Sequence, residues 1–79
     1  MEILLFGIIR EIVGKPRLSI PPQDQVHSVK MLKSWITERY PAVRGLPSIA
    51  IAVDYEFATD TDPLNSESEI AVIPPVSGG

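Results

Sequence analysis

The stretch that decides the fold is residues 28–40, which read SVKMLKSWITERY. Its apolar side chains recur with the period of one helical face, at Val29, Leu32, Ile36 and Tyr40. Ser28 is a favoured N-cap type, and Pro41 disfavours helical backbone in the residue before it. The pattern predicts one amphipathic helix over 28–40, whose apolar face must be buried. Trp35 widens that face, and we expect it to be the largest single contributor to the core.

Short apolar segments on both sides of this helix indicate a sheet for it to cover. We expect strands at residues 2–7, 17–20, 49–53, 57–58 and 69–73, a turn at 54–56, and a short helix over 8–13 that ends at Gly14. Leu64, alone in a polar loop, should point inward. The order predicts an α+β domain with a small mixed sheet and the long helix packed across one face. The β-grasp fold of ubiquitin-like proteins is one candidate among several that this order allows.

The first and last strands carry more apolar residues than one buried face requires. In the last strand, Ile70 and Val72 share a face, so Ala71 and Ile73 point the other way. By the same alternation, Phe6 lies opposite the core face of the first strand. We therefore expect an exposed apolar surface on the outer face of the sheet, the kind of surface that contacts a partner.

Composition limits the chemistry that the chain can perform. Its 79 residues suit one domain, and we place that domain at 1–75 with a flexible tail at 76–79. There is no cysteine, which excludes a disulfide, a thiolate metal site and a cysteine nucleophile. The net charge of −3 is unlike that of a nucleic-acid-binding domain. His27, the one histidine, is expected at the surface or in a cap, and we expect no bound metal.

Targeting signals are not apparent in the sequence. No run of residues approaches the ~18 apolar residues that a membrane span needs. The first residues, MEILLF, lack the basic start and cleavage pattern of a secretory signal. We expect a cytoplasmic protein that binds no membrane.

The final residues, 74–79, read PPVSGG and end in a free carboxylate. Prolines stiffen the base of this arm, and glycines leave its tip narrow and unrestricted. Fully extended, the arm reaches at most ~20 Å. Such an arm suits insertion into another protein, although terminal glycines alone are also typical of a frayed end.

The sequence resembles the small, sulfur-carrying subunit of molybdopterin synthase. Residues 70–79, IAVIPPVSGG, look like that family's C-terminal signature. The family's other patterns are matched by LLF at 4–6, RE at 10–11, VG at 13–14, AVD at 52–54, DPL at 62–64 and EI at 69–70. The chain departs from the family at Asp54, where Asn is common, and at Ile73, where an aromatic residue is frequent.

This resemblance implies a ubiquitin-like β-grasp fold and a sulfur-transfer cycle. A ubiquitin-activating-like adenylyltransferase, which binds the ATP, joins AMP to the carboxylate of Gly79, and a sulfurtransferase system converts it to a thiocarboxylate. The large synthase subunit then receives the tail, and the sulfur passes to cyclic pyranopterin monophosphate in molybdenum cofactor biosynthesis. Gly78 gives clearance at the reacting carbon. The small subunit binds no cofactor directly and is not an enzyme on its own, since the catalytic side chains of this transferase belong to the large subunit.

The resemblance also implies docking positions. Phe6, Phe57 and Ile73 match them, with Arg10 as a polar neighbour. The arm itself should contact the large subunit, in a complex expected to be a heterotetramer, through Pro74, Pro75, Val76 and Ser77. A second minor core is the alternative use for the apolar residues.

Other functions remain open at this stage. A carrier for thiamine, tungsten-cofactor or tRNA thiolation would share the fold and the Gly-Gly end. A non-catalytic β-grasp interaction module would share the fold alone, and its tail would be incidental.

Overall fold

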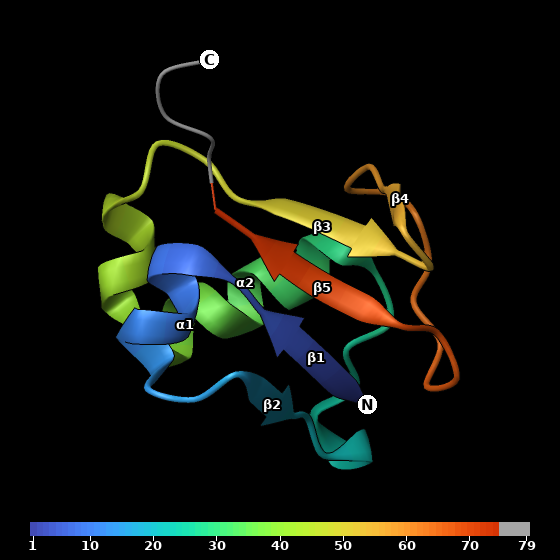
Figure 1. The fold of residues 1–79 in the computed structure, drawn as a ribbon. Coiled ribbons are helices and arrows are strands. Elements are labelled where there is room, and N and C mark those ends of the chain that lie inside the picture. The colour runs from blue at the N-terminus through green and yellow to red at the C-terminus, as the bar shows by residue number, and fades with distance from the viewer. Residues whose placement is uncertain (75–79) are drawn as a thin grey trace.

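The computed structural model describes residues 1–74, which fold into one sheet with helices packed against it (Figure 1). The elements are β1 (Glu2–Leu5), α1 (Gly7–Val13), β2 (Arg17–Ser19), α2 (Val29–Arg39), β3 (Ala50–Val53), β4 (Glu56–Phe57) and β5 (Ile70–Ile73). Short 3₁₀ turns, η1 (Pro22–Asp24) and η2 (Pro41–Gly45), flank α2. The domain boundary expected at 75 and the tail at 76–79 lie outside the described residues.

Within residues 1–74 the strands form a five-stranded sheet in the order β2-β1-β5-β3-β4. The central pair, β1 and β5, is parallel, and the remaining neighbours are antiparallel. Figure 1 shows α2 crossing behind this sheet and α1 at the end where β1 and β5 both finish. This is the mixed β-grasp sheet with one long helix across one face, as expected from the sequence.

The core lies between the sheet and α2. The strands supply Ile3, Leu5, Leu18, Ile51, Ile70 and Val72, and α2 supplies Val29, Leu32 and Ile36, all of them buried. Each such aliphatic side chain contributes about 1.5–3 kcal/mol on burial. Leu64 is also buried in this cluster, as expected for the one apolar residue of its loop.

The ends of α2 confirm the sequence prediction within one residue. The Ser28 hydroxyl accepts a hydrogen bond from the backbone N–H of Met31 at 3.2 Å, and the residue has extended backbone dihedrals typical of an N-cap. Tyr40, immediately before Pro41, leaves the helical region and ends the helix. The short helix α1 likewise ends at Gly14, which has a left-handed φ of 87°.

The expected role of Trp35 is wrong. Trp35 is only half buried and packs against the edge of the core rather than filling it. Its indole Nε1 donates to Asp24 Oδ2 at 2.9 Å, and the Arg39 guanidinium lies 4.6 Å from its ring centroid. A buried indole N–H needs an acceptor, and the carboxylate that supplies one lies at the surface, so the ring stays at the boundary.

Candidate functional site

The outer face of the sheet, opposite α2, carries a continuous row of apolar side chains. The strand register aligns Leu4 of β1 with Ala71 of β5, Ala71 with Ala52 of β3, and Ala52 with Phe57 of β4. These four residues cross the sheet in one line. Because residues paired directly across a sheet share a face, they form one surface.

This surface contains a hollow of about 230 Å³. We call the apolar residues that line it the apolar patch: Leu4, Phe6, Ala52, Tyr55, Phe57, Ala71 and Ile73. Two alanines from neighbouring central strands form its floor, and larger side chains stand at its borders. Phe6 is 47% exposed, Phe57 75% and Tyr55 88%, so the patch is a surface and not a second core.

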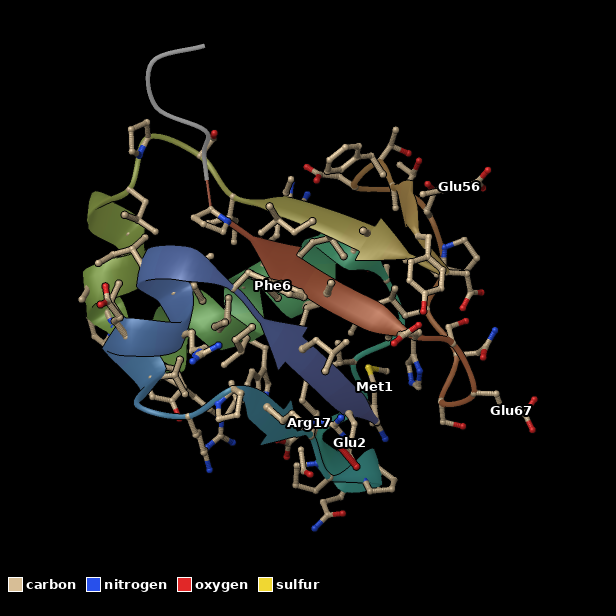
Figure 2. The ribbon with its side chains drawn as sticks, in the orientation of Figure 1. Met1, Glu2, Phe6, Arg17, Glu56 and Glu67 are labelled. Atoms are coloured by element: carbon tan, nitrogen blue, oxygen red, sulfur yellow. The ribbon has the colours of Figure 1, made fainter. Side chains whose placement is uncertain are left out.

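The structure brings together three of the residues that the sequence singled out for docking. Phe6, Phe57 and Ile73 all line the hollow although they come from three separate segments of the chain. Arg10 is exposed on α1 but does not line the hollow. Figure 2 shows Phe6 at the corner where β1 meets α1, while Glu56 of β4 lies at the far side of the sheet.

The base of the tail lies beside this patch. Pro74 follows Ile73 directly, and its ring packs against Gly7, the first residue of α1. A Cβ on Gly7 would meet the Pro74 Cγ at 2.6 Å, which is too close for a side chain to fit without a shift. Gly7 also has a φ of +56°, a backbone conformation that residues with side chains rarely adopt. Pro74 is therefore held at the corner where α1 begins, next to Phe6. The other predicted tail residues, Pro75, Val76, Ser77, Gly78 and Gly79, lie outside the described residues.

Gly7 is a residue that the sequence reasoning placed wrongly. We expected it inside the first strand, but β1 ends at Leu5 and α1 begins at Gly7. The abrupt change from strand to helix needs a left-handed residue, which glycine adopts without steric cost. A glycine directly before helically spaced apolar residues was the available signal.

The β3–β4 turn forms the border of the patch farthest from Pro74. Asp54 and Tyr55 have φ values of 51° and 70°, so both lie in the left-handed region. Asp54 exchanges hydrogen bonds with Glu69 at the start of β5: the Glu69 N–H donates to Asp54 Oδ1 at 2.9 Å, and the Asp54 N–H donates to the Glu69 carbonyl at 2.8 Å. Hydrogen bonding to Glu69, followed by its negative charge, raises the pKa of Tyr55. The sequence reasoning included neither Tyr55 nor Glu69 among the docking residues.

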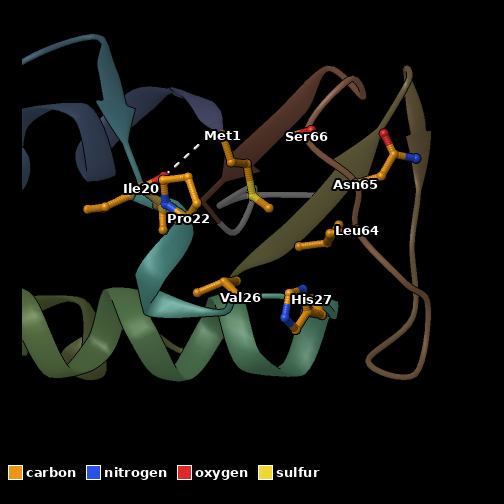
Figure 3. A pocket seen from close by; sticks show the side chains of 9 residues that line it. Met1, Ile20, Pro22, Val26, His27, Leu64, Asn65 and Ser66 are labelled. Atoms are coloured by element: carbon orange, nitrogen blue, oxygen red, sulfur yellow. Dashed lines mark hydrogen bonds between the residues drawn. The ribbon is translucent and has the colours of Figure 1, made fainter.

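A second hollow, of about 360 Å³, lies at the other end of β1, away from the tail (Figure 3). Met1, Ile20, Val26 and Leu64 give it apolar walls, and the backbone nitrogen of Met1 donates to the Ile20 carbonyl at 3.2 Å. His27 is its one titratable side chain and is exposed, as expected. A lone imidazole without a neighbouring acid, base or second ligand supports no specific chemistry here.

The described residues contain neither a cluster of metal ligands nor a membrane-spanning helix. Among residues 1–74, no three His, Cys, Asp or Glu side chains are grouped so that they could hold a metal ion. No helix in that same range combines the length and the apolar character that crossing a bilayer requires.

The sequence of the chain is similar to that of known proteins over nearly its whole length. The ThiS family model matches residues 3–79. The molybdopterin synthase sulfur carrier subunit of Dictyostelium discoideum is 37% identical over 82 residues, which cover 99% of this chain and 94% of that protein. The protein of the same name from Caenorhabditis elegans is also 37% identical, and the match covers 100% of this chain and 96% of the relative.

A solved structure gives the same picture of the fold. The small archaeal modifier protein 1 from Methanosarcina acetivorans superposes with a TM-score of 0.78 at 25% identity. The superposition covers 99% of this chain and 94% of that one. The similarity therefore extends over the whole domain rather than over one motif.

Proposed function

The chain belongs to the ThiS family, and from that membership we propose that it is the sulfur-carrier subunit of a molybdopterin synthase. The observation that carries this proposal is the position of the apolar patch beside Pro74, the base of the arm that ends in Gly78-Gly79. Full-length relatives at 37% identity that bear this name support it.

The chemistry of the proposal is confined to the terminal carboxylate of Gly79. A free carboxylate is a poor acyl donor, so the α-phosphorus of ATP is first attacked by the carboxylate oxygen, giving an acyl-adenylate and releasing pyrophosphate. Hydrosulfide, delivered by the sulfurtransferase, then attacks the acyl carbon and AMP leaves, which gives the thiocarboxylate. Donation of that sulfur to cyclic pyranopterin monophosphate leaves the acyl group to be hydrolysed, and water supplies the oxygen that restores the carboxylate. The acyl-adenylate and the sulfur are transient, and the chain needs no bound cofactor of its own for these steps.

The domain itself has the task of presenting the tail. Phe6 and Ile73 lie on the docking surface at its border with Pro74, so contact through the patch fixes where the arm starts. The arm then spans up to ~20 Å into the partner. Acid and base groups for sulfur transfer come from the large subunit, which makes this chain the non-catalytic subunit of the transferase.

Three partners follow from the proposal. An adenylyltransferase of the ubiquitin-activating type binds ATP and the tail, and a sulfurtransferase supplies the sulfur. The large synthase subunit completes the enzyme, as a heterotetramer of two subunits of each kind. All these steps take place in the cytoplasm.

Intact-mass measurement tests the proposal directly. The full chain is incubated with a competent activating enzyme, ATP and a sulfur source. The expected mass gain equals the difference between one sulfur and one oxygen atom. A chain lacking Gly79 is the matched control and should gain nothing. An unchanged mass of the full chain beside an active enzyme contradicts the proposal.

Related pathways are separated by the final acceptor. A carrier for thiamine, tungsten-cofactor or tRNA thiolation would gain the same mass, so the thiocarboxylated chain is next mixed with the large synthase subunit and cyclic pyranopterin monophosphate. Formation of molybdopterin in step with loss of the added mass identifies the molybdenum pathway. A non-catalytic interaction module would bind a partner equally well with and without Gly79.

A further inference from the structure

Tyr55, at the tip of the β3–β4 turn, is not explained by the needs of the fold. It is 88% exposed, so it contributes nothing substantial to the core. Its φ of +70° lies in the left-handed region, where an L-residue costs roughly 1–2 kcal/mol and where hairpin turns favour glycine. Local strain of this kind clusters at functional sites. The phenol ring is therefore best explained by a contact with something outside the chain.

Two carboxylates act on this ring, those of Glu69 and Asp54. We call Asp54 and Glu69 the acidic rim, because both are exposed at the end of the patch opposite Pro74. Glu69 lines the same hollow as Tyr55, and its carboxylate is the first cause of the raised pKa of that phenol. Within residues 1–74, neither rim residue forms a salt bridge. This end of the patch thus combines the exposed aromatic face of Tyr55 with the negative charge of the acidic rim, which no salt bridge in the described part of the chain compensates.

The chain itself shows which side chain such a combination accepts. On α2, the Arg39 guanidinium lies 4.6 Å from the Trp35 ring centroid, and its Nη2 is 3.1 Å from Asp24 Oδ2. There an aromatic face and a neighbouring carboxylate hold one guanidinium between them. Tyr55 and Glu69 present the same pair of groups at the border of the apolar patch.

We propose that Tyr55 and Glu69 together bind an arginine side chain of the large synthase subunit. The guanidinium stacks on the phenol ring and donates to the Glu69 carboxylate. Its flat, permanently charged fork suits both contacts better than a lysine ammonium does. The inference rests on the proposed function, because it names a contact within that docking surface.

This contact would give the apolar patch a direction. Apolar contact alone is tolerant of rotation, whereas a charge at one end of a surface fixes the register of the two proteins. Here the charge stands at the β3–β4 end, and the tail leaves from the Phe6 end. An arginine held at the rim therefore orients the opposite corner, with Pro74, towards the entrance of the partner's active site.

Calorimetric titration of the full chain into the large subunit tests the proposal. Tyr55→Leu keeps an apolar side chain and the same backbone strain but removes the aromatic face, and it should weaken the Kd by about 2- to 30-fold. Glu69→Gln should weaken it by roughly tenfold, the loss of one charged hydrogen bond. Glu67→Gln is the matched control, because Glu67 is exposed but lies outside the hollow, and it should leave the Kd unchanged. Tyr55→Phe, which keeps the ring, should bind within a few-fold of the parent.

The salt dependence separates a specific contact from general attraction. The parent affinity should fall as NaCl is added, and Glu69→Gln should flatten that dependence more than Glu67→Gln does. Equal effects of the two glutamine variants, or unchanged binding by Tyr55→Leu, overturn the proposal while leaving the carrier function in place. Failure of the parent chain to gain sulfur, measured without the large subunit, is the separate result that overturns the carrier function. Because both side chains are exposed, thermal unfolding should show each variant folded.

Discussion

Replacing Phe6 by aspartate should separate docking from folding. Phe6 is the N-cap residue of α1, with an extended backbone at φ −128° and no side-chain cap hydrogen bond. Aspartate is a preferred N-cap and stabilises a helix by about 0.5–2 kcal/mol over a non-capping residue. Phe6 is 47% exposed, so its removal forfeits roughly half of the ~1.5–3 kcal/mol that full burial provides. The two effects oppose each other, and the free energy of unfolding should change by less than about 1 kcal/mol.

The effect of the same change on docking has no such compensation. A carboxylate at position 6 would be desolvated inside the apolar patch, whose hollow no cationic side chain of residues 1–74 lines, at a cost of several kcal/mol. The Kd for the large subunit should rise by about a hundredfold or more. Phe6→Ala loses only the remaining apolar contact, about 1 kcal/mol, and should weaken binding by roughly fivefold.

Urea unfolding and calorimetric titration measure the two quantities on the same samples. Phe6→Asn is the matched control, since asparagine caps α1 as aspartate does but introduces no charge. It should be as stable as Phe6→Asp and should bind more tightly. Parent-like binding by Phe6→Asp would remove Phe6 from the docking surface. A loss of more than about 2 kcal/mol in unfolding free energy would instead make Phe6 a core residue.

Three further predictions concern the caps and turns that shape the domain. Ser28→Ala removes the acceptor at the start of α2 and should cost about 1 kcal/mol, lowering the thermal midpoint by roughly 4–8 °C; an unchanged midpoint contradicts the capping role. Asp54→Ala loses the acceptor for the Glu69 N–H and puts alanine in the left-handed region, a cost of about 1–3 kcal/mol in urea unfolding. Asp54→Asn keeps the oxygen and tolerates that region, so equal unfolding curves for the two variants would refute the account. Glu69→Gln removes the main group that raises the pKa of Tyr55, so the Tyr55 phenol should lose its proton at lower pH than in the parent. The absorbance titration uses a Tyr40→Phe background, in which Tyr55 is the one tyrosine. Identical titration curves with and without Glu69→Gln would argue against the contact between Tyr55 and Glu69.

The elements whose signals are local could be predicted from the sequence. Helix α2 has a capping serine, a helical apolar period and a terminating proline within one continuous stretch, and its bounds agree within one residue. The alternation in β5 correctly divided Ile70 and Val72, which are buried, from Ala71 and Ile73 on the outer face. These signals suffice because each is carried by neighbours along the chain.

The features that depend on pairing between distant strands could not be predicted. The alignment of Leu4, Ala71, Ala52 and Phe57 requires the parallel pairing of β1 with β5, which no local pattern specifies. The left-handed Tyr55 is equally hidden, because the sequence Asp-Tyr lacks the glycine that usually marks this turn. Trp35 was misplaced for a related reason: its acceptor, Asp24, comes from a separate segment.

The position of β5 determines how firmly Pro74 is held beside the apolar patch. β5 lies between β1 and β3 and is hydrogen-bonded on both sides, so its end is held more firmly than the end of an edge strand would be. Ala71 and Ile73 of the same strand belong to the patch, and Pro74 follows directly against Gly7. Part of the apolar patch thus lies on the strand that leads directly into Pro74, and no hinge separates them within the described residues. Binding through the patch, as proposed, would therefore fix the position of Pro74 against the partner without a conformational change in the domain.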